Sequence, residues 1–228
     1  MFAILNVFLY SLYLNRYNEA QKVEVLGETS IEERLQAENI RYDSIPENTT
    51  KETYVSGNIR VYVTEELKQI DNQKFEVLNQ SQLISTFEKP VPLGNIEDTT
   101  NMRKFVDENV FEGASYELFS VNEKEKKASF FQTINNRQIF FNKNALLTIY
   151  WNEENEVYKY EQTGFEELED NFDQTETLLP DERAVEVLYQ RNLLKPNSKI
   201  TMISLGYSTL VQLTETQVFA PTWRVRVE

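Results

Sequence analysis

Residues 116–162, which decide the fold, read YELFSVNEKEKKASFFQTINNRQIFFNKNALLTIYWNEENEVYKYEQ. Five short segments, rich in apolar and aromatic residues, are typical of β-strands. Runs rich in Asn, Glu and Lys, residues that tolerate turn conformations, separate the segments. Their regular spacing predicts an antiparallel meander, without crossover helices. The predicted strands cover residues 116–121, 128–134, 138–141, 145–151 and 157–162.

Amphipathic segments on both sides of this stretch predict three helices, near residues 31–39, 100–111 and 181–193. Ser30 and Glu33 form a capping box before the first, Asp98 or Thr99 opens the second, and Pro180 precedes the third. Further strands are predicted at 59–63, 75–77, 83–87, 199–213 and 218–227. The predicted fold class is therefore α+β, with antiparallel sheets covered on one side by the helices.

Two segments are predicted to lie outside the sheets. Residues 89–94 contain Pro90 and Pro92, and a proline has no N–H to donate to a neighbouring strand. We therefore expect two subdomains that divide near residues 90–95. The acidic run 166–173 has neither the regular ligand spacing nor the glycine of a calcium loop, which favours a solvated loop.

The N-terminus is a hydrophobic run from Phe2 to Leu14, interrupted only by Asn6 and Ser11. As a helix it would rise about 20 Å, short of the roughly 30 Å hydrocarbon layer. A signal peptide would need a basic start and a small-residue cleavage site, and a buried helix would keep a polar face. We favour the outer part of a transmembrane helix whose first turns are missing, so that residues 1–22 form a partial anchor and linker.

A polar stripe on this helix predicts a contact with another helix. Asn6, Tyr10, Tyr13 and Tyr17 follow at helical spacing on one face. An interfacial aromatic belt would explain Tyr13 and Tyr17. It does not explain Asn6, whose amide is costly in lipid and can hydrogen-bond to a neighbouring helix for roughly 0.6–2 kcal/mol.

Composition excludes several classes of function. The chain has 23 basic and 37 acidic residues, a net charge of −14 that argues against a nucleic-acid partner. It has no cysteine and no histidine, so disulfides, thiolate metal sites and the usual general base are absent.

We predict no catalytic, cofactor-binding or metal-binding residue, although a pair of carboxylates or a Ser–Lys pair is not excluded. The aromatic residues Phe130, Phe131, Phe140, Phe141, Tyr158 and Tyr160 are predicted to be core, with stacking on a ligand as the alternative.

Several segments together resemble the YycI (WalI) family of membrane-anchored regulators of the YycFG (WalRK) two-component system in Gram-positive bacteria. They are FAILNVFL at 2–9, VFEGASYEL at 110–118, AVEVLY at 184–189 with Asn192 and Leu193, LGY at 205–207 and APTWRV at 220–225. Residues 23–95 and 96–228 would then be two extracytoplasmic subdomains, the second expected to be truncated at its C-terminus.

The resemblance implies a non-enzymatic regulator of a sensor histidine kinase in cell-wall homeostasis. It implies a single-pass protein of the cell membrane with its large domain outside the cytoplasm. The implied partners are a YycH-like sister protein and a kinase of the YycG (WalK) type, reached partly through membrane helices, and no cofactor is implied. The alternative function is an extracytoplasmic ligand- or peptide-binding domain, which would show a deep apolar pocket lined by the strand aromatics.

Overall fold

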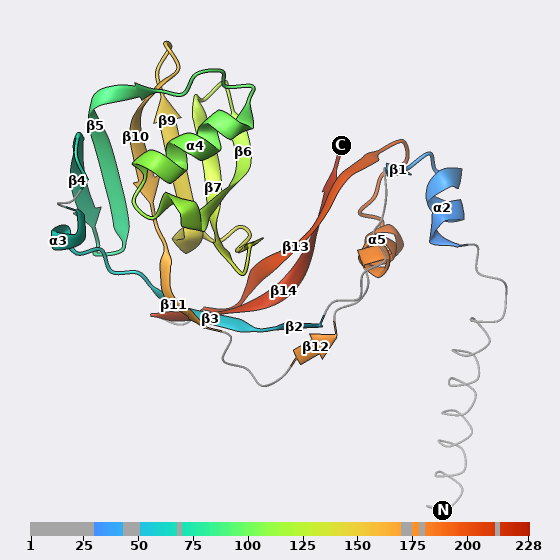
Figure 1. Cartoon of the computed structure of the whole chain (residues 1–228). Helices are drawn as coiled ribbons and strands as arrows, with labels where there is room; N and C mark the ends of the chain where they lie inside the picture. Colours follow the sequence, from blue (N-terminus) through green and yellow to red (C-terminus); the bar gives the residue numbers. More distant parts are fainter. Residues whose placement is uncertain (1–29, 43–50, 68–69, 170–174, 178–180, 213–214) are drawn as a thin grey trace, which may run out of the picture. The chain divides into compact units, whose positions relative to one another are not determined.

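The computed structural model describes residues 30–42, 51–67, 70–169, 175–177, 181–212 and 215–228. They form two compact units. The smaller unit draws its described residues from 1–45, 185–201 and 226–228, and the larger unit from 46–184 and 202–225. Figure 1 shows the order of the elements along the chain.

The larger unit is built on a seven-stranded sheet of order β4-β5-β10-β9-β7-β6, with β8 beside β7. Strands β6, β7, β9 and β10 are antiparallel neighbours, which confirms the predicted meander. The strands are β4 (Gln73–Leu78), β5 (Gln82–Pro92), β6 (Tyr116–Asn122), β7 (Lys127–Ile134), β8 (Arg137–Gln138), β9 (Leu146–Trp151) and β10 (Glu156–Gln162). Two 3-10 turns, η1 (Gly113–Ser115) and η2 (Lys143–Ala145), precede β6 and β9.

Helix α4 (Thr99–Asn109) lies across one face of this sheet (Figure 1). The Asp98 side chain caps it by accepting a hydrogen bond from the Thr100 amide at 3.0 Å. Its apolar face is Met102, Phe105 and Val106, all of them buried.

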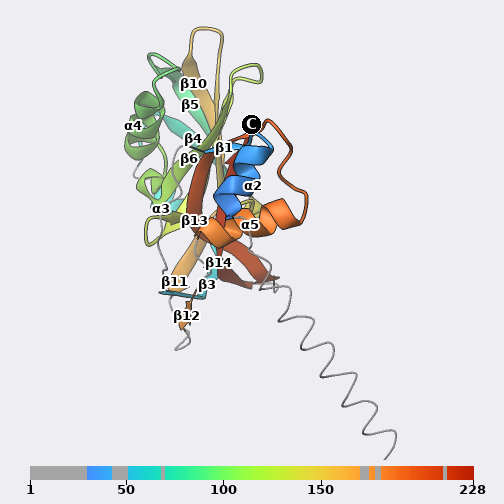
Figure 2. The ribbon, with the colours of Figure 1, turned by 90° about the vertical axis from the view of Figure 1, so that its right-hand side faces the viewer.

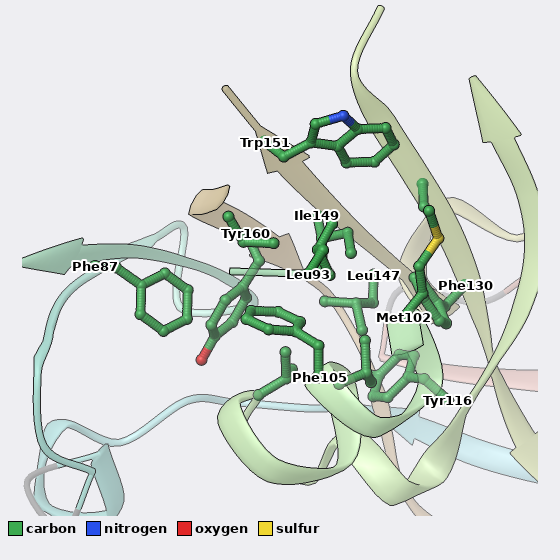
Figure 3. Packing of buried hydrophobic residues seen from close by; sticks show 14 of the residues in the cluster. Phe87, Leu93, Met102, Phe105, Tyr116, Phe130, Leu147, Ile149, Trp151 and Tyr160 are labelled. Carbon is green, nitrogen blue, oxygen red and sulfur yellow. The ribbon is translucent and has the colours of Figure 1, made fainter. Parts of the chain in front are cut away.

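The core lies between α4 and the sheet, and Figure 3 shows its side chains meeting from the two layers. Leu147, Ile149 and Trp151, at every second position of β9, point into it, because successive side chains of a strand point to opposite faces. Each fully buried aliphatic or aromatic side chain contributes about 1.5–3 kcal/mol to stability, so this layer dominates the folding energy of the unit. Its members include Phe130, Leu147, Ile149, Trp151, Tyr160, Met102 and Phe105.

A second sheet has the order β1-β13-β14-β3-β11. It contains β1 (Arg41–Tyr42), β3 (Val55–Ile59), β11 (Phe165–Glu169), β13 (Lys199–Gln212) and β14 (Thr216–Val227). Its pairing of β1 with β13 is parallel, whereas β3 pairs antiparallel with both β11 and β14. A separate two-stranded pair joins β2 (Lys51–Thr53) to β12 (Thr175–Thr177).

The smaller unit contains α2 (Ile31–Ala37) and most of α5 (Asp181–Gln190), which lie side by side in Figure 2. The predicted cap is present, because the Ser30 hydroxyl accepts a hydrogen bond from the Glu33 amide at 3.3 Å. Asn39 takes the left-handed conformation after the helix, with φ of 55°. The Tyr189 hydroxyl then donates to the Glu38 carboxylate at 2.8 Å, which ties the ends of the two helices together.

The α+β class and the three predicted helices are confirmed, with α5 ending at Gln190 and a short fourth helix, α3 (Thr64–Leu67), that the sequence did not indicate. The strand predicted at 59–63 is wrong, because β3 ends at Ile59. The Arg60 amide instead donates to the Gly164 carbonyl, and the Tyr62 amide donates to the Gln80 carbonyl in a separate loop. Tyr62 is the buried residue here, and Val61 and Val63 are exposed.

Three further predictions are corrected. Strand β5 runs through Pro90 and Pro92, since its pairing with β4 ends at Phe87 and a proline is tolerated where one side has no neighbouring strand. The first part of the acidic run forms β11, whose backbone pairs with β3. The strand predicted at 138–141 ends at Gln138, where the chain turns.

The domain division predicted near residues 90–95 stays a prediction. The hydrophobic run at the N-terminus lies outside the described residues. Among the residues that the structure describes, no helix is long and apolar enough to cross a membrane.

Two core tyrosines make the fold sensitive to alkaline pH. The Tyr116 hydroxyl donates to the Thr163 carbonyl at 2.7 Å, and the Tyr160 hydroxyl accepts from the Phe111 amide at 3.3 Å. Burial raises the pKa of Tyr116 and that of Tyr160 to about 12, above the ordinary value of 10.0. The unfolded chain therefore loses these protons at lower pH than the folded chain does, so stability falls as pH rises from 10 towards 12.

We predict that Tyr160→Phe weakens this alkaline loss. The free energy of unfolding of the parent protein should fall between pH 10 and 12, and the fall should be smaller in the variant by roughly 2–3 kcal/mol, the equivalent of two pKa units. Urea unfolding at pH 9, 10, 11 and 12 measures it. The matched control is Tyr158→Phe on the same strand, because Tyr158 is 40% exposed. Identical pH profiles for the parent and both variants would contradict the prediction.

Candidate functional site

Arg60 is the centre of the main charged cluster of the larger unit. Its Nη1 lies 2.6 Å from Glu112 Oε2 and its Nη2 lies 3.4 Å from Glu66 Oε2. The guanidinium also lies 4.9 Å from the centre of the Phe111 ring. Only 15% of the Arg60 side chain is exposed, so these contacts hold the segment after β3 against the end of α4.

The groups around Arg60 are suited to structure rather than to proton transfer. Burial raises the pKa of Tyr62 and that of Tyr116, so both phenols, which are protonated at neutral pH, lose their protons even less readily than an exposed tyrosine does. Glu66 and Glu112 are held by the guanidinium. In the described part of the chain, no group of three or more Asp or Glu side chains is placed to hold a metal ion.

An open groove of about 530 Å³ lies in the smaller unit, along α2 and the start of β13. Its polar lining residues are Glu32 and Gln36 on the helix and Arg41 and Lys199 on the strands, so both negative and positive side chains face the groove. The phenylalanines and tyrosines of residues 116–162 do not line it. Its lining includes Tyr42 and Ile40, but none of the strand aromatics that the ligand-binding alternative requires.

The distinctive surface of the larger unit is a group of four phenylalanines and one arginine, which we call the aromatic cluster: Phe119, Phe131, Phe140, Phe141 and Arg224. The rings of Phe119 and Phe131 meet edge to face at 4.8 Å, and those of Phe119 and Phe141 at 5.3 Å. The Arg224 guanidinium lies 4.0 Å from the centre of the Phe119 ring. Phe131 and Phe140 are buried, whereas Phe141 is 75% exposed.

Phe141 also has an unfavourable backbone, with φ of 55°, the left-handed region that bulky side chains rarely adopt. Such strain persists only where neighbouring residues over-determine it. The residue after Phe141, Asn142, is fixed in place, because its Nδ2 donates to Thr209 Oγ1 and to Gln217 Oε1, both at 2.7 Å. Its Oδ1 accepts from the Asn144 amide at 2.8 Å.

The residue before Phe141, Phe140, is also fixed in place. Its amide donates to the Tyr207 carbonyl at 2.7 Å, and Ile139 forms a parallel bridge with Tyr207. A Cβ at position 206 would come within 2.4 Å of the Phe140 ring, so only glycine permits this close approach. Phe141 is therefore held between two fixed neighbours, with its ring turned towards solvent.

The structure divides the aromatic residues singled out in the sequence. Phe130, Phe131, Phe140 and Tyr160 are core, as predicted, whereas the prediction is wrong for Phe141 and for Tyr158. The doublet Phe140-Phe141 carried a signal for this, since neighbouring residues in an extended chain point to opposite sides. Nothing in the local pattern indicated Arg224, which a distant strand supplies. The helix-contact residues Asn6, Tyr10, Tyr13 and Tyr17 lie outside the described residues, and that contact stays a prediction.

Fold and surface together define a strand-rich α+β protein in two compact units, with an exposed aromatic cluster on the larger one. A family model described as "YycI protein" matches residues 20–228. The chain belongs to the YycI family, as its sequence indicated, and this family is associated with the YycFG two-component system.

A comparison with curated proteins gave no match. Among solved structures, the chain is similar to an uncharacterized protein from Eubacterium rectale ATCC 33656, at 12% sequence identity and a TM-score of 0.45. The similarity covers 83% of this chain and 82% of that one.

We predict that two adjacent phenylalanines respond oppositely to substitution. Phe140→Ala should lower the free energy of unfolding by about 3–5 kcal/mol, because it removes a buried ring. Phe141→Asn should change it by less than about 1 kcal/mol, because asparagine relieves the left-handed strain while losing the edge-to-face contacts. Urea unfolding of both variants at pH 7 measures this. A large loss in Phe141→Asn would mean that the exposed ring supports the fold.

Proposed function

We propose that this protein is a non-enzymatic regulator that sets the activity of a sensor histidine kinase from outside the cytoplasm, together with a YycH-like sister protein. The match of residues 20–228 to the YycI family carries the proposal. The kinase would be of the YycG (WalK) type, and the system would control cell-wall homeostasis. The hydrophobic run at residues 2–14 would anchor the protein in the membrane as a single-pass helix.

The described surface is compatible with this role, because it offers a means of contacting a protein. The charged side chains around Arg60 are paired with one another. The aromatic cluster, by contrast, exposes a large apolar side chain, as protein interfaces commonly do. Acidic composition also disfavours nucleic acid as the partner.

The second candidate function is a ligand- or peptide-binding domain outside the cytoplasm. Only the exposure of Phe141 and Tyr158 favours it, since exposed aromatic rings can stack on a ligand. Of the strand aromatics singled out in the sequence, Phe130 and Tyr160 belong to the core between α4 and the sheet, and Phe131 and Phe140 are also buried. Regulation by protein contact therefore explains more of the molecule.

We predict that Asn6→Leu weakens assembly in the membrane while the outer domain stays folded. A side-chain amide next to a neighbouring helix gains roughly 0.6–2 kcal/mol that leucine cannot supply. Affinity purification of the full-length protein from detergent-solubilised membranes, followed by quantification of the histidine kinase and the sister protein, measures the loss.

Leu9→Ala is the matched control, because Leu9 falls on a different face of the same predicted helix and should change recovery much less. If Asn6→Leu and the parent recover equal amounts of partner at matched membrane levels, the stripe is an aromatic belt and no contact surface. If the parent itself recovers neither protein, the proposed function loses its support.

A further inference from the structure

We infer that the aromatic cluster is the docking surface for a second folded protein, and that Phe141 is the anchor that enters an apolar pocket on that partner. The inference rests on the proposed function, since the partner is one of the proteins with which this regulator assembles. It adds where on the outer domain the partner binds and what chemistry the partner must present.

The first observation is that Phe141 is exposed although its backbone has an unfavourable left-handed conformation. Phe141 is 75% exposed and left-handed, although an asparagine or glycine would fit the turn better. Strained residues that the surrounding structure fixes in place occur mainly at functional sites. Its contacts within the aromatic cluster leave most of the ring exposed, so the ring is available to contact a partner.

The second observation is that the anchor is rigid before any partner arrives. Phe140 is fixed on Gly206 and Tyr207, and Asn142 is fixed on Thr209 and Gln217. The ring itself rests edge to face against Phe119 at 5.3 Å. Because little conformational freedom remains to be lost, insertion of this ring into a pocket has a low entropic cost.

Charge identifies the kind of partner. Although the chain carries a net charge of −14, the exposed Lys143 follows the anchor by two residues, and Arg224 lies over the Phe119 and Phe140 rings. A complementary surface has an apolar pocket for Phe141 and a carboxylate that reaches Lys143.

A second copy of this chain does not meet these requirements. Two copies with net charges of −14 repel each other. A symmetric contact of the same surface would also place Lys143 near its own counterpart. The occupant is therefore a different folded protein, with an apolar pocket bordered by carboxylates.

Photo-crosslinking in the native membrane tests this directly. The full-length protein carries a benzophenone derivative of phenylalanine in place of Phe141 in one strain and in place of Tyr158 in another. Tyr158 is the matched control, an aromatic residue of the same unit that is 40% exposed and outside the cluster. Illumination should yield an adduct at position 141 with the kinase or the sister protein, identified by mass spectrometry, at least about tenfold above the yield at position 158.

Recovery of the partner by affinity purification provides the second measurement. Phe141→Ser should reduce the recovered kinase or sister protein at least about tenfold, as expected for an anchor residue. Lys143→Glu should reduce it less, by roughly two- to tenfold, because an exposed charge at the rim contributes modestly. Thermal unfolding of both variants establishes that the domain is folded.

Each outcome decides a separate point. Equal crosslinking at 141 and 158, or parent-like recovery of Phe141→Ser, overturns the docking surface while the proposed function stands. A crosslink between two copies of this chain overturns the choice of partner. Failure of the parent protein to recover either candidate overturns the proposed function, and this inference with it.

Discussion

The packing of α4 on the seven-stranded sheet is the constraint on which the larger unit depends. One helix supplies Met102, Phe105 and Val106, and four meander strands supply the facing layer. Since the other face of β6 and β7 is not needed to bury this helix, Phe119 and Phe131 are available for a second task. The positions of Phe119 and Phe131 follow from which face α4 occupies.

Strand register then assembles the cluster from distant parts of the chain. Phe119 comes from an irregularity in β6, Phe131 from β7, and Phe140 and Phe141 from the turn after β8. The β13–β14 pair adds Gly206, Tyr207 and Arg224. The turn at Phe141 is thereby fixed at both neighbouring residues, and it holds the Phe141 ring in solvent.

Sequence patterns predicted the parts of this fold that local chemistry determines. Short apolar segments with turn residues between them predicted the meander strands, and a serine cap and an asparagine in the left-handed region marked the ends of α2. Patterns failed where a distant partner decides the outcome. The acidic segment that includes Glu166 and Leu168 became a strand because β3 offers a free edge, and β5 accommodates Pro90 because β4 ends beside it. The candidate surface was missed for the same reason: the doublet Phe140-Phe141 signals that one ring faces away from the core, but the β13–β14 residues that fix the turn are distant in sequence.

The central claim is that the larger unit presents Phe141 on a rigid turn before any partner binds. Hydrogen–deuterium exchange of the free protein measures that rigidity, because local opening exposes the amides that hold the turn. The Ile139 and Phe140 amides donate to Gln132 and Tyr207, so both should exchange as slowly as the amides of β9 in the core. Exchange of these two amides at the rate of an unfolded chain would contradict the account, because the ring would then have no fixed position.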